Sequence, residues 1–408
     1  MIIFFTVCIL LAILMVVREA SFVAGLGISF YSLRVISYLC DVKKGRIAPE
    51  KNFFKYALFV TFFPLAFLGP VVLYRDMKET LYSGKNACGE DVSRSLLRIT
   101  VGVFKKVVIA NALVLPLEVI VAQPDTYSGA YVLFLLLLYS AEIYCDFSGG
   151  IDICIGIAGL FSVSLPENFN KPFSSLSLRE FWNRWHISLG EWFERYVFYP
   201  ISLSRPMQKI SRLCRKRFGT RIGKRLPLYA ATLFTWTMTG LWHGSEGHFV
   251  AWGLVNGVLV LLSQEISRPL SRLCDRYPAW RDSLIRRVIA RARVFLIIGA
   301  VRLLDVYKSL PLTVRMLSTA FYDLGSYRSL LSGGVLELVD PSSLALVLLS
   351  LLAIYLFDKK ENRAEEISKK PFAAALCIML LTLSTFLFGT YGLGFDASDF
   401  IYSKFNGG

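Results

Sequence analysis

The sequence predicts an all-α polytopic membrane protein, and three observations point to this class. Of the 408 residues, 55% are hydrophobic and only 18% are charged, with a mean hydropathy of +0.53. An ordinary soluble chain is about 45–50% apolar and about 25% charged. The third observation is a succession of apolar runs, since about 20 apolar residues span the core of a bilayer. This composition excludes intrinsic disorder, which requires few apolar residues.

The apolar runs follow one another along almost the whole chain. Met1–Val17 lacks a basic start and a small-residue cleavage site, so we predict a membrane helix there and not a signal peptide. Ten further candidate spans are Ser21–Cys40, Tyr56–Tyr74, Gly102–Ala122, Gly129–Cys145, Ile151–Phe161, Leu228–Trp242, Phe249–Leu262, Val294–Leu304, Ser343–Phe357 and Phe372–Leu393. Several are too short to cross alone, which predicts tilted or re-entrant helices around a buried cavity. We expect roughly ten such helices in one membrane domain, residues 1–408.

The formal net charge of +15 indicates which loops face the cytoplasm. Arg205–Arg225 contains nine Lys and Arg residues and no acidic residue. The positive-inside rule predicts that this loop is cytoplasmic, and the basic stretch Arg268–Arg293 is a second cytoplasmic candidate. A nucleic-acid arm is the alternative, but the aromatic residues that single-strand binders place between their basic residues are missing. We therefore expect the lipid bilayer, and no nucleic acid, as a partner.

Polar residues interrupt several of the apolar runs. We expect Lys105 and Lys106 to extend along a helix end toward the lipid headgroups. Asp146 differs, because it lies in the glycine-rich sequence Cys145–Gly150 between two apolar runs. Ionisable groups inside a membrane are costly and usually face a cavity or a partner, so we predict that this break carries function.

The aromatic segment Phe181–Tyr196 is the first candidate site. Read as a continuous helix, it brings Trp182 and His186 one turn apart and pairs Glu180 with Arg184. Its apolar stripe consists of Trp182, Trp185, Leu189, Trp192 and Tyr196. From this segment alone, an amphipathic helix at the membrane interface remains an alternative to a functional site.

The segment Thr239–His248 is the second candidate site. It separates two strongly apolar runs, and three glycines allow its backbone to bend or to approach a neighbour closely: Gly240, Gly244 and Gly247. His243 lies at this break, where an imidazole titrates near neutral pH and is suited to act as a general base. A plain turn with a hydrogen-bonded histidine remains the alternative.

Several familiar chemistries are excluded by missing motifs. The sequence contains no nucleophile elbow, P-loop, dinucleotide fingerprint or His-Glu-x-x-His motif. His186 and His243 lie 57 residues apart without nearby cysteine ligands, so no metal site is predicted. The remaining chemistry is proton transfer by histidine without a covalent nucleophile. This suits direct transfer of an acyl group from a thioester to a hydroxyl, with nearby donors stabilising the oxyanion.

At these residues the sequence resembles the membrane-bound O-acyltransferase family. The resemblance is to its bacterial branch, typified by alginate O-acetyltransferase and the teichoic-acid D-alanyl transfer protein. The similar motifs occur in the same order over most of the chain: Gly27–Tyr31, Phe63–Pro70, Asp146–Gly149, Glu167–Phe173, Phe181–His186, Gly240–Gly244 and Asp399–Tyr402. The resemblance implies a ring of membrane helices around a central tunnel, in which donor and acceptor meet from opposite faces.

The resemblance also assigns roles to residues. The principal catalytic histidine of the family corresponds to His243, and the second histidine corresponds to His186. The mechanism that we infer has His243 as general base, with His186 and Asn183 or Arg184 orienting the substrate or stabilising the oxyanion. The supporting or substrate-binding positions are Asp146, Asn168, Trp182, Asn183, Arg184, Trp185 and Trp242.

The resemblance implies O-acetylation of an exported cell-envelope polysaccharide, directly or through an acyl-accepting partner protein. The donor is a cytoplasmic acyl thioester, acetyl-CoA or an acyl-carrier protein, and no bound cofactor is expected. D-alanyl transfer to teichoic acid remains an alternative within the family, and a non-enzymatic transporter remains one from another class. We expect a multi-pass protein of the bacterial plasma membrane.

Two departures from the family pattern are visible. Gly150 replaces the usual tyrosine after Asp146–Gly149, which is expected to loosen that turn. Only 26 residues precede Gly27, where relatives carry more helix. We therefore expect the N-terminus to be short by two helices or its start site to be misassigned.

Overall fold

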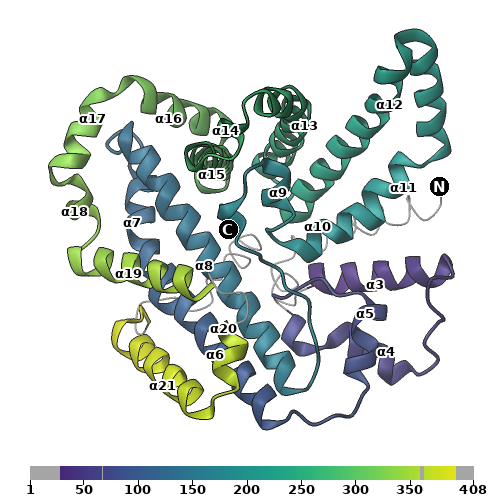
Figure 1. Cartoon of the computed structure of the whole chain (residues 1–408), viewed down its shortest axis with the longest axis horizontal. Coiled ribbons are helices and arrows are strands. Elements are labelled where there is room, and N and C mark those ends of the chain that lie inside the picture. The colour runs from purple at the N-terminus through teal and green to yellow at the C-terminus, as the bar shows by residue number, and fades with distance from the viewer. Residues whose placement is uncertain (1–27, 67, 359–362, 392–408) are drawn as a thin grey trace. The chain divides into compact units, whose positions relative to one another are not determined.

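A computed structural model of the chain describes residues 28–66, 68–358 and 363–391. The predicted first span Met1–Val17, the motif residue Gly27 and the tail motif Asp399–Tyr402 lie outside these described residues. Within them, regular structure is helical apart from one isolated antiparallel bridge, between Phe169 and Trp185 (Figure 1). This agrees with the predicted all-α class, and the ring of roughly ten helices stays a prediction.

The chain divides into two compact units. Unit 1 comprises Met1–Lys51 and Glu167–Asp305, and unit 2 comprises Asn52–Pro166 and Val306–Gly408. These units are defined by packing alone, so the prediction of one membrane domain over residues 1–408 stays a prediction.

Unit 1 contains one N-terminal helix and the helices of the central part of the chain. Its 3-10 helix is η3 (Pro172–Ser174) and its π-helix is η4 (Glu194–Phe198). Its α-helices are α3 (Ile28–Lys43), α9 (Leu178–Trp182), α10 (Ile187–Phe193), α11 (Tyr199–Ser202), α12 (Arg205–His243), α13 (Gly247–Arg276), α14 (Pro278–Arg281) and α15 (Leu284–Tyr307).

Glycines allow α12 and α13 to approach closely. A Cβ atom on Gly253 would lie 3.2 Å from the Cα atom of Gly240, and one on Gly240 would clash with the carbonyl oxygen of Phe249. A Cβ on Gly244 would clash with the Phe249 ring, whereas Gly247 has open space around it. Small residues at such a crossing let two helix backbones touch. The glycines of the second candidate segment therefore fix how tightly α12 turns into α13.

The basic stretch Arg205–Arg225 forms a helical hairpin within α12, not the loop that we predicted. Gly219 has φ 83° and ψ 166°, and there the helix doubles back (Figure 1). The Ser211 hydroxyl donates to the Gly223 carbonyl at 2.8 Å across the turn, and a Cβ on Gly223 would lie 2.5 Å from the Arg215 nitrogen. We call residues 205–225 the basic hairpin. Only a residue without a side chain adopts the conformation of Gly219 at no steric cost.

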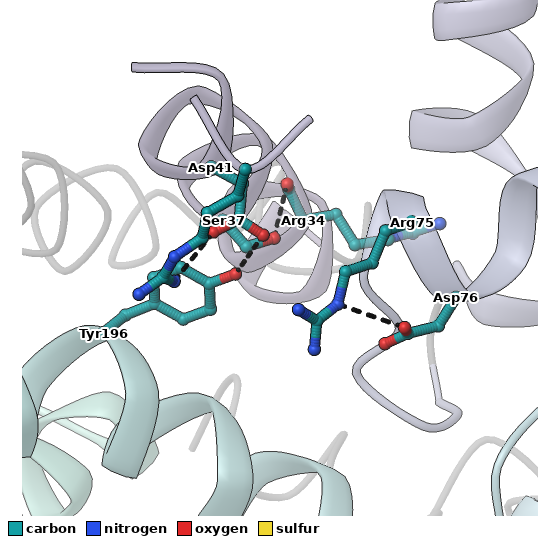
Figure 2. A network of polar contacts seen from close by, with 7 residues as sticks. Arg34, Ser37, Asp41, Arg75, Asp76 and Tyr196 are labelled. Atoms are coloured by element: carbon teal, nitrogen blue, oxygen red, sulfur yellow. Dashed lines mark hydrogen bonds and ion pairs between the residues drawn. The ribbon is translucent and has the colours of Figure 1, made fainter. Parts of the chain in front are cut away.

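The first helix of unit 1 anchors the aromatic segment. The Trp192 indole N–H donates to the Leu33 carbonyl oxygen at 3.1 Å. The Tyr196 hydroxyl donates to the Asp41 carboxylate at 2.8 Å, and Asp41 also pairs with Arg46 at 3.0 Å. Figure 2 shows Tyr196 pointing toward Asp41 on α3. These bonds fix α10 and η4 on α3.

Unit 2 is built around one long helix, α8 (Ala130–Leu160), against which α6, α7, α16 and α17 pack. Its short helices include the 3-10 helix η1 (Phe63–Leu65) and the π-helices η2 (Lys105–Ala110) and η5 (Leu330–Gly334). Its other α-helices are α4 (Phe53–Thr61), α5 (Tyr74–Leu81), α6 (Gly89–Phe104), α7 (Asn111–Ala122), α16 (Leu310–Tyr322), α17 (Leu324–Ser329), α18 (Val335–Leu338), α19 (Pro341–Asp358), α20 (Arg363–Ser368) and α21 (Pro371–Phe388).

The predicted break at Asp146 does not exist. Helix α8 runs without interruption through Cys145–Gly150 and joins the two spans that we expected to be separate. A Cβ on Gly149 would lie 2.7 Å from the Gly102 carbonyl oxygen of α6, and one on Gly102 would lie 2.5 Å from the Gly149 oxygen. The glycines serve a close contact between helices, so they do not bend the chain.

Three described helices are long and apolar enough to cross a membrane: α8, α13 and α21. A fourth span is added if the strongly bent pair Leu324–Leu338 and Pro341–Tyr355 counts as one. The predicted span Tyr56–Tyr74 is divided into α4, η1 and α5, because Pro64 and Pro70 cannot donate to a continuous helix. The apolar end of α12 belongs to a helix whose other end is the basic hairpin.

Candidate active site

His186 is held in a strained turn between two short helices. Its φ of 49° and ψ of 52° lie in the left-handed region, which costs energy for a residue with a side chain. The backbone around it is fixed by two bonds, from the Ile187 nitrogen to the Asn168 oxygen and from the Asn170 nitrogen to the Arg184 oxygen, both 3.0 Å. Such strain persists only where neighbours enforce it, so this turn is built to place His186.

This turn corrects the expected continuous helix over Phe181–Tyr196. Helix α9 ends at Trp182, and α10 begins only at Ile187. Trp182 and His186 therefore do not follow one another on a single helical face. The predicted ion pair of Glu180 with Arg184 is confirmed at 2.8 Å.

Asn168 fixes the orientation of the His186 ring. Asn168 is fully buried, and its Oδ1 atom accepts from the Ser188 nitrogen at 3.1 Å and from the Ser188 hydroxyl at 2.9 Å. Its Nδ2 atom lies 3.1 Å from His186 Nδ1, and its Oδ1 atom lies farther from that nitrogen, at 3.3 Å. Because Oδ1 already serves two donors, Nδ2–H donates to Nδ1, and a neutral imidazole then carries its proton on Nε2. We assign His186 as a hydrogen-bond donor at Nε2.

The protonation state of His186 supports this assignment. Burial, together with the nearby His243, lowers the pKa of His186 well below its ordinary value. A neutral imidazole at neutral pH is the form that has one donor and one acceptor nitrogen.

Trp242 lies in contact with both histidines. Its ring is buried, with its centroid 5.0 Å from that of His243 and 6.4 Å from that of His186. The ring of Phe30 on α3 packs edge-to-face against the Trp242 ring, with the two centroids 5.8 Å apart. His243 is half-buried as the last residue of α12. The two predicted histidines are thus brought into one aromatic cluster of unit 1.

Three indoles extend this cluster beyond His243. Trp182 of α9, Trp236 of α12 and Trp252 of α13 contact one another with ring centroids 4.8–6.0 Å apart. Trp252 also packs edge-to-face against His243 at 5.1 Å. Sequence analysis did not select Trp236 and Trp252. Their position on either side of the Gly240–Gly247 turn was the available signal.

Trp185 and Arg184 have structural partners in the same loop region. The guanidinium of Arg302 lies 3.9 Å from the centre of the Trp185 ring, and Phe181 stacks on that ring at 5.8 Å. A buried cation over an indole face is a favourable contact. Arg184 donates to the Ser174 hydroxyl at 2.7 Å as well as pairing with Glu180. Asn183 is exposed at the end of α9.

Asp146 belongs to unit 2 and pairs there with a lysine. It is fully buried on α8 and forms an ion pair with Lys106 of η2. The neighbouring Lys105 pairs with Asp152 at 2.8 Å, and Arg98 of α6 reaches Asp152 at 3.0 Å. The expectation that Lys105 and Lys106 extend to the headgroups was wrong, because both lysines are buried against α8.

The third histidine, His248, contacts a neighbouring carboxylate. His248 pairs with Glu246 at 3.1 Å at the start of α13. Among residues that the structure describes, no group of three His, Cys, Asp or Glu side chains is placed to hold a metal ion.

Unit 1 is thus helical and contains a buried and a half-buried histidine in an aromatic surrounding. The family model of the membrane-bound O-acyltransferases matches residues 13–213. This match agrees with the resemblance predicted from the motifs. The matched stretch includes His186 and Asn168 and ends before the segment that carries His243.

Curated relatives carry names of two related activities. A probable alginate O-acetylase of Azotobacter vinelandii is 33% identical over 241 residues, which are 59% of this chain and 44% of the relative. The peptidoglycan O-acetyltransferase of Helicobacter pylori is 30% identical over 268 residues, 59% and 48% of the two chains. The teichoic acid D-alanyltransferase of Bacillus subtilis is 26% identical over 243 residues, 58% of each. The chain thus spans less than half the length of these two O-acetyltransferase relatives.

Proposed function

We propose that the protein is a membrane-bound O-acyltransferase that acetylates a cell-envelope polymer. The observation that carries this proposal is the arrangement of unit 1, in which Asn168 orients a neutral His186 and Trp242 contacts both His186 and His243. The names of the relatives support the reaction class and the kind of acceptor.

In the proposed mechanism, His243 is the general base. It removes the proton of an acceptor hydroxyl as that oxygen attacks the carbonyl carbon of an acyl thioester. The Nε2–H of His186 donates to the developing oxyanion. The intermediate then collapses, the carbon–sulfur bond breaks, and the leaving thiolate takes the proton from His243. The products are the ester and a free thiol, so no covalent enzyme intermediate is required.

The other predicted site residues take supporting roles in this proposal. Asn168 and Trp242 position the two histidines, and Trp182 and Trp185 complete the aromatic surroundings. Arg184 ties the His186 turn to Ser174. Asp146 and the exposed Asn183 retain their roles as supporting positions only as predictions from the family resemblance.

We propose that the donor reaches the enzyme from the cytoplasmic side of a bacterial plasma membrane, which the chain crosses several times. The basic hairpin supports this, because eight of its nine basic side chains are exposed and it contains no acidic residue. Coenzyme A and acyl-carrier proteins are both acidic, so a cationic surface attracts either donor. The acceptor is an exported polysaccharide, or a partner protein that carries the acyl group onward.

D-alanyl transfer is the second candidate function. The relatives named teichoic acid D-alanyltransferase in Bacillus subtilis and Streptococcus thermophilus favour it, at 26% and 24% identity. It would use the same two histidines and a carrier-protein thioester as donor.

The test uses purified full-length protein in detergent. Labelled acetyl-CoA and D-alanyl carrier protein are supplied separately, and thiol release is measured with and without polysaccharide. We expect acetyl-CoA to be consumed and His243→Ala to abolish the reaction. Consumption of the D-alanyl donor alone would favour the second candidate. A protein that consumes neither donor, such as a transporter, would contradict the proposal.

A further inference from the structure

Trp252 is a buried indole at the side of His243 for which the mechanism above has no use. It lies on α13, nine residues beyond His243, and its ring meets the imidazole edge-to-face at 5.1 Å with an interplanar angle of 71°. Only 8% of the residue is exposed. Sequence and family resemblance did not single it out.

The indole N–H of Trp252 has no hydrogen-bond acceptor among the described residues, although the atom is fully buried. A buried indole N–H usually finds a partner, since leaving it unpaired costs the lost solvation of the donor. In the same unit, the buried indole N–H of Trp192 does have an acceptor, because it donates to the Leu33 carbonyl oxygen. The donor of Trp252 thus differs from that of Trp192.

The ring of Trp252 is fixed in place. Val301 and Leu304 of α15 form a core cluster with it, and Trp182 and Trp236 pack against its other sides. The next residue, Gly253, lies directly on the backbone of α12 at Trp236. Rotating the ring to find another acceptor would disturb all these contacts, so the ring is held in one orientation.

We propose that the Trp252 Nε1–H donates a hydrogen bond to the carbonyl oxygen of the acyl thioester at His243, as a second oxyanion donor beside His186. This inference rests on the proposed acyl transfer. A rigid, dry donor fits this task because it needs no reorganisation as negative charge develops on the oxygen. Without substrate the Trp252 N–H is left unpaired by the part of the chain that the structure describes, as expected for a donor whose acceptor is the substrate.

The test compares variants that remove the N–H with a matched control. Trp252→Phe removes the donor and part of the ring. Replacement of Trp252 by 3-benzothienylalanine removes the donor alone, because sulfur takes the place of the N–H in a bicyclic ring of similar shape. Trp280→Phe is the control, since it removes the indole N–H of an exposed tryptophan on α14 that has no role in the proposed site. Initial rates of acetyl-CoA consumption are measured on protein that elutes as a monodisperse peak.

We expect both Trp252 variants to lose about 10²–10³-fold in kcat, the usual effect of removing one oxyanion donor, with little change in KM for acetyl-CoA. Trp280→Phe should stay near the wild-type rate. A benzothienyl variant with wild-type kcat would overturn the proposal, as would a rise in KM without loss of kcat. An inactive wild-type protein would instead contradict the proposed function.

Discussion

At the scale of single residues, Asn168 determines what His186 is able to do. Its two side-chain atoms serve three partners, and the two Ser188 donors on Oδ1 leave Nδ2 to face the imidazole. The family motif alone identified both residues as site positions. It did not indicate Ser188, which orients the Asn168 amide by donating two hydrogen bonds to Oδ1. No sequence pattern predicts those hydrogen bonds. The tautomer of His186 follows from that unforeseen partner.

The lowered pKa of His186 predicts a pH dependence of stability. The unfolded chain binds a proton at this histidine below pH 6.5, its ordinary value, whereas the folded protein stays neutral there to a lower pH. Unfolding therefore takes up a proton between the lowered pKa of the folded protein and pH 6.5. The stability that the neutral His186 contributes is complete above pH 6.5 and is lost as the pH falls below that value. We expect the melting temperature in detergent to fall from pH 7 to pH 5.

The matched variant for this prediction is His186→Gln, which cannot titrate. Its melting temperature should depend less steeply on pH, by the equivalent of up to about one proton. Identical pH slopes for wild type and variant would show that His186 remains protonated in the folded protein.

At the scale of helices, burial and packing decide what the sequence left open. Phe181–Tyr196 has helical spacing throughout, and it contains no residue that signals the left-handed turn at His186. Distant contacts with Asn168 and Asn170 impose that turn. Likewise, Gly149 and Gly150 suggested a break in α8, but Gly149 serves the contact with α6. Local sequence identified these residues as special and could not tell which neighbour required them.

The buried pair Lys106–Asp146 gives a prediction at this scale. Removing one partner leaves a buried charge unpaired, which typically costs about 3–5 kcal/mol. Lys106→Met or Asp146→Asn alone should therefore lower the melting temperature strongly, and the double variant should recover most of the loss. The exposed pair Lys369–Glu365 on α20 is the control, where Lys369→Met should have little effect. If the double variant lost as much stability as the two single variants lose together, the two residues would not be a coupled pair.

At the scale of the whole molecule, composition and charge predicted the class of protein well. The helical class is confirmed, and the family model matches residues 13–213, as the motifs predicted. Helices α13 and α21 overlap predicted spans, and α8 joins two of them. The larger number of spans that the sequence predicts stays a prediction, because among the described residues only these three helices and one bent pair meet the length and apolarity of a span. The charge excess proved more informative, since it is concentrated in one exposed element, the basic hairpin.

The basic hairpin predicts how donor binding depends on charge. The substitutions Arg212→Gln, Lys216→Gln and Arg217→Gln, combined in one variant, should raise KM for acetyl-CoA severalfold and weaken its dependence on salt, with kcat unchanged. The hairpin lies apart in sequence from the histidines, so the chemical step should not respond. Lys85→Gln with Lys369→Gln removes exposed positive charge elsewhere and should leave KM as it is. An equal effect of both variants would indicate nonspecific attraction.

The proposed role of His243 leads to the decisive measurement, the initial rate of thiol release from acetyl-CoA by folded protein in detergent. His243→Ala is compared with His248→Ala, which replaces a buried histidine five residues away that pairs with Glu246. We expect His243→Ala to lose at least about 10²-fold, as for removal of a general base, and His248→Ala to keep most of the wild-type rate. A His243→Ala protein that consumes acetyl-CoA at the wild-type rate would contradict the mechanism.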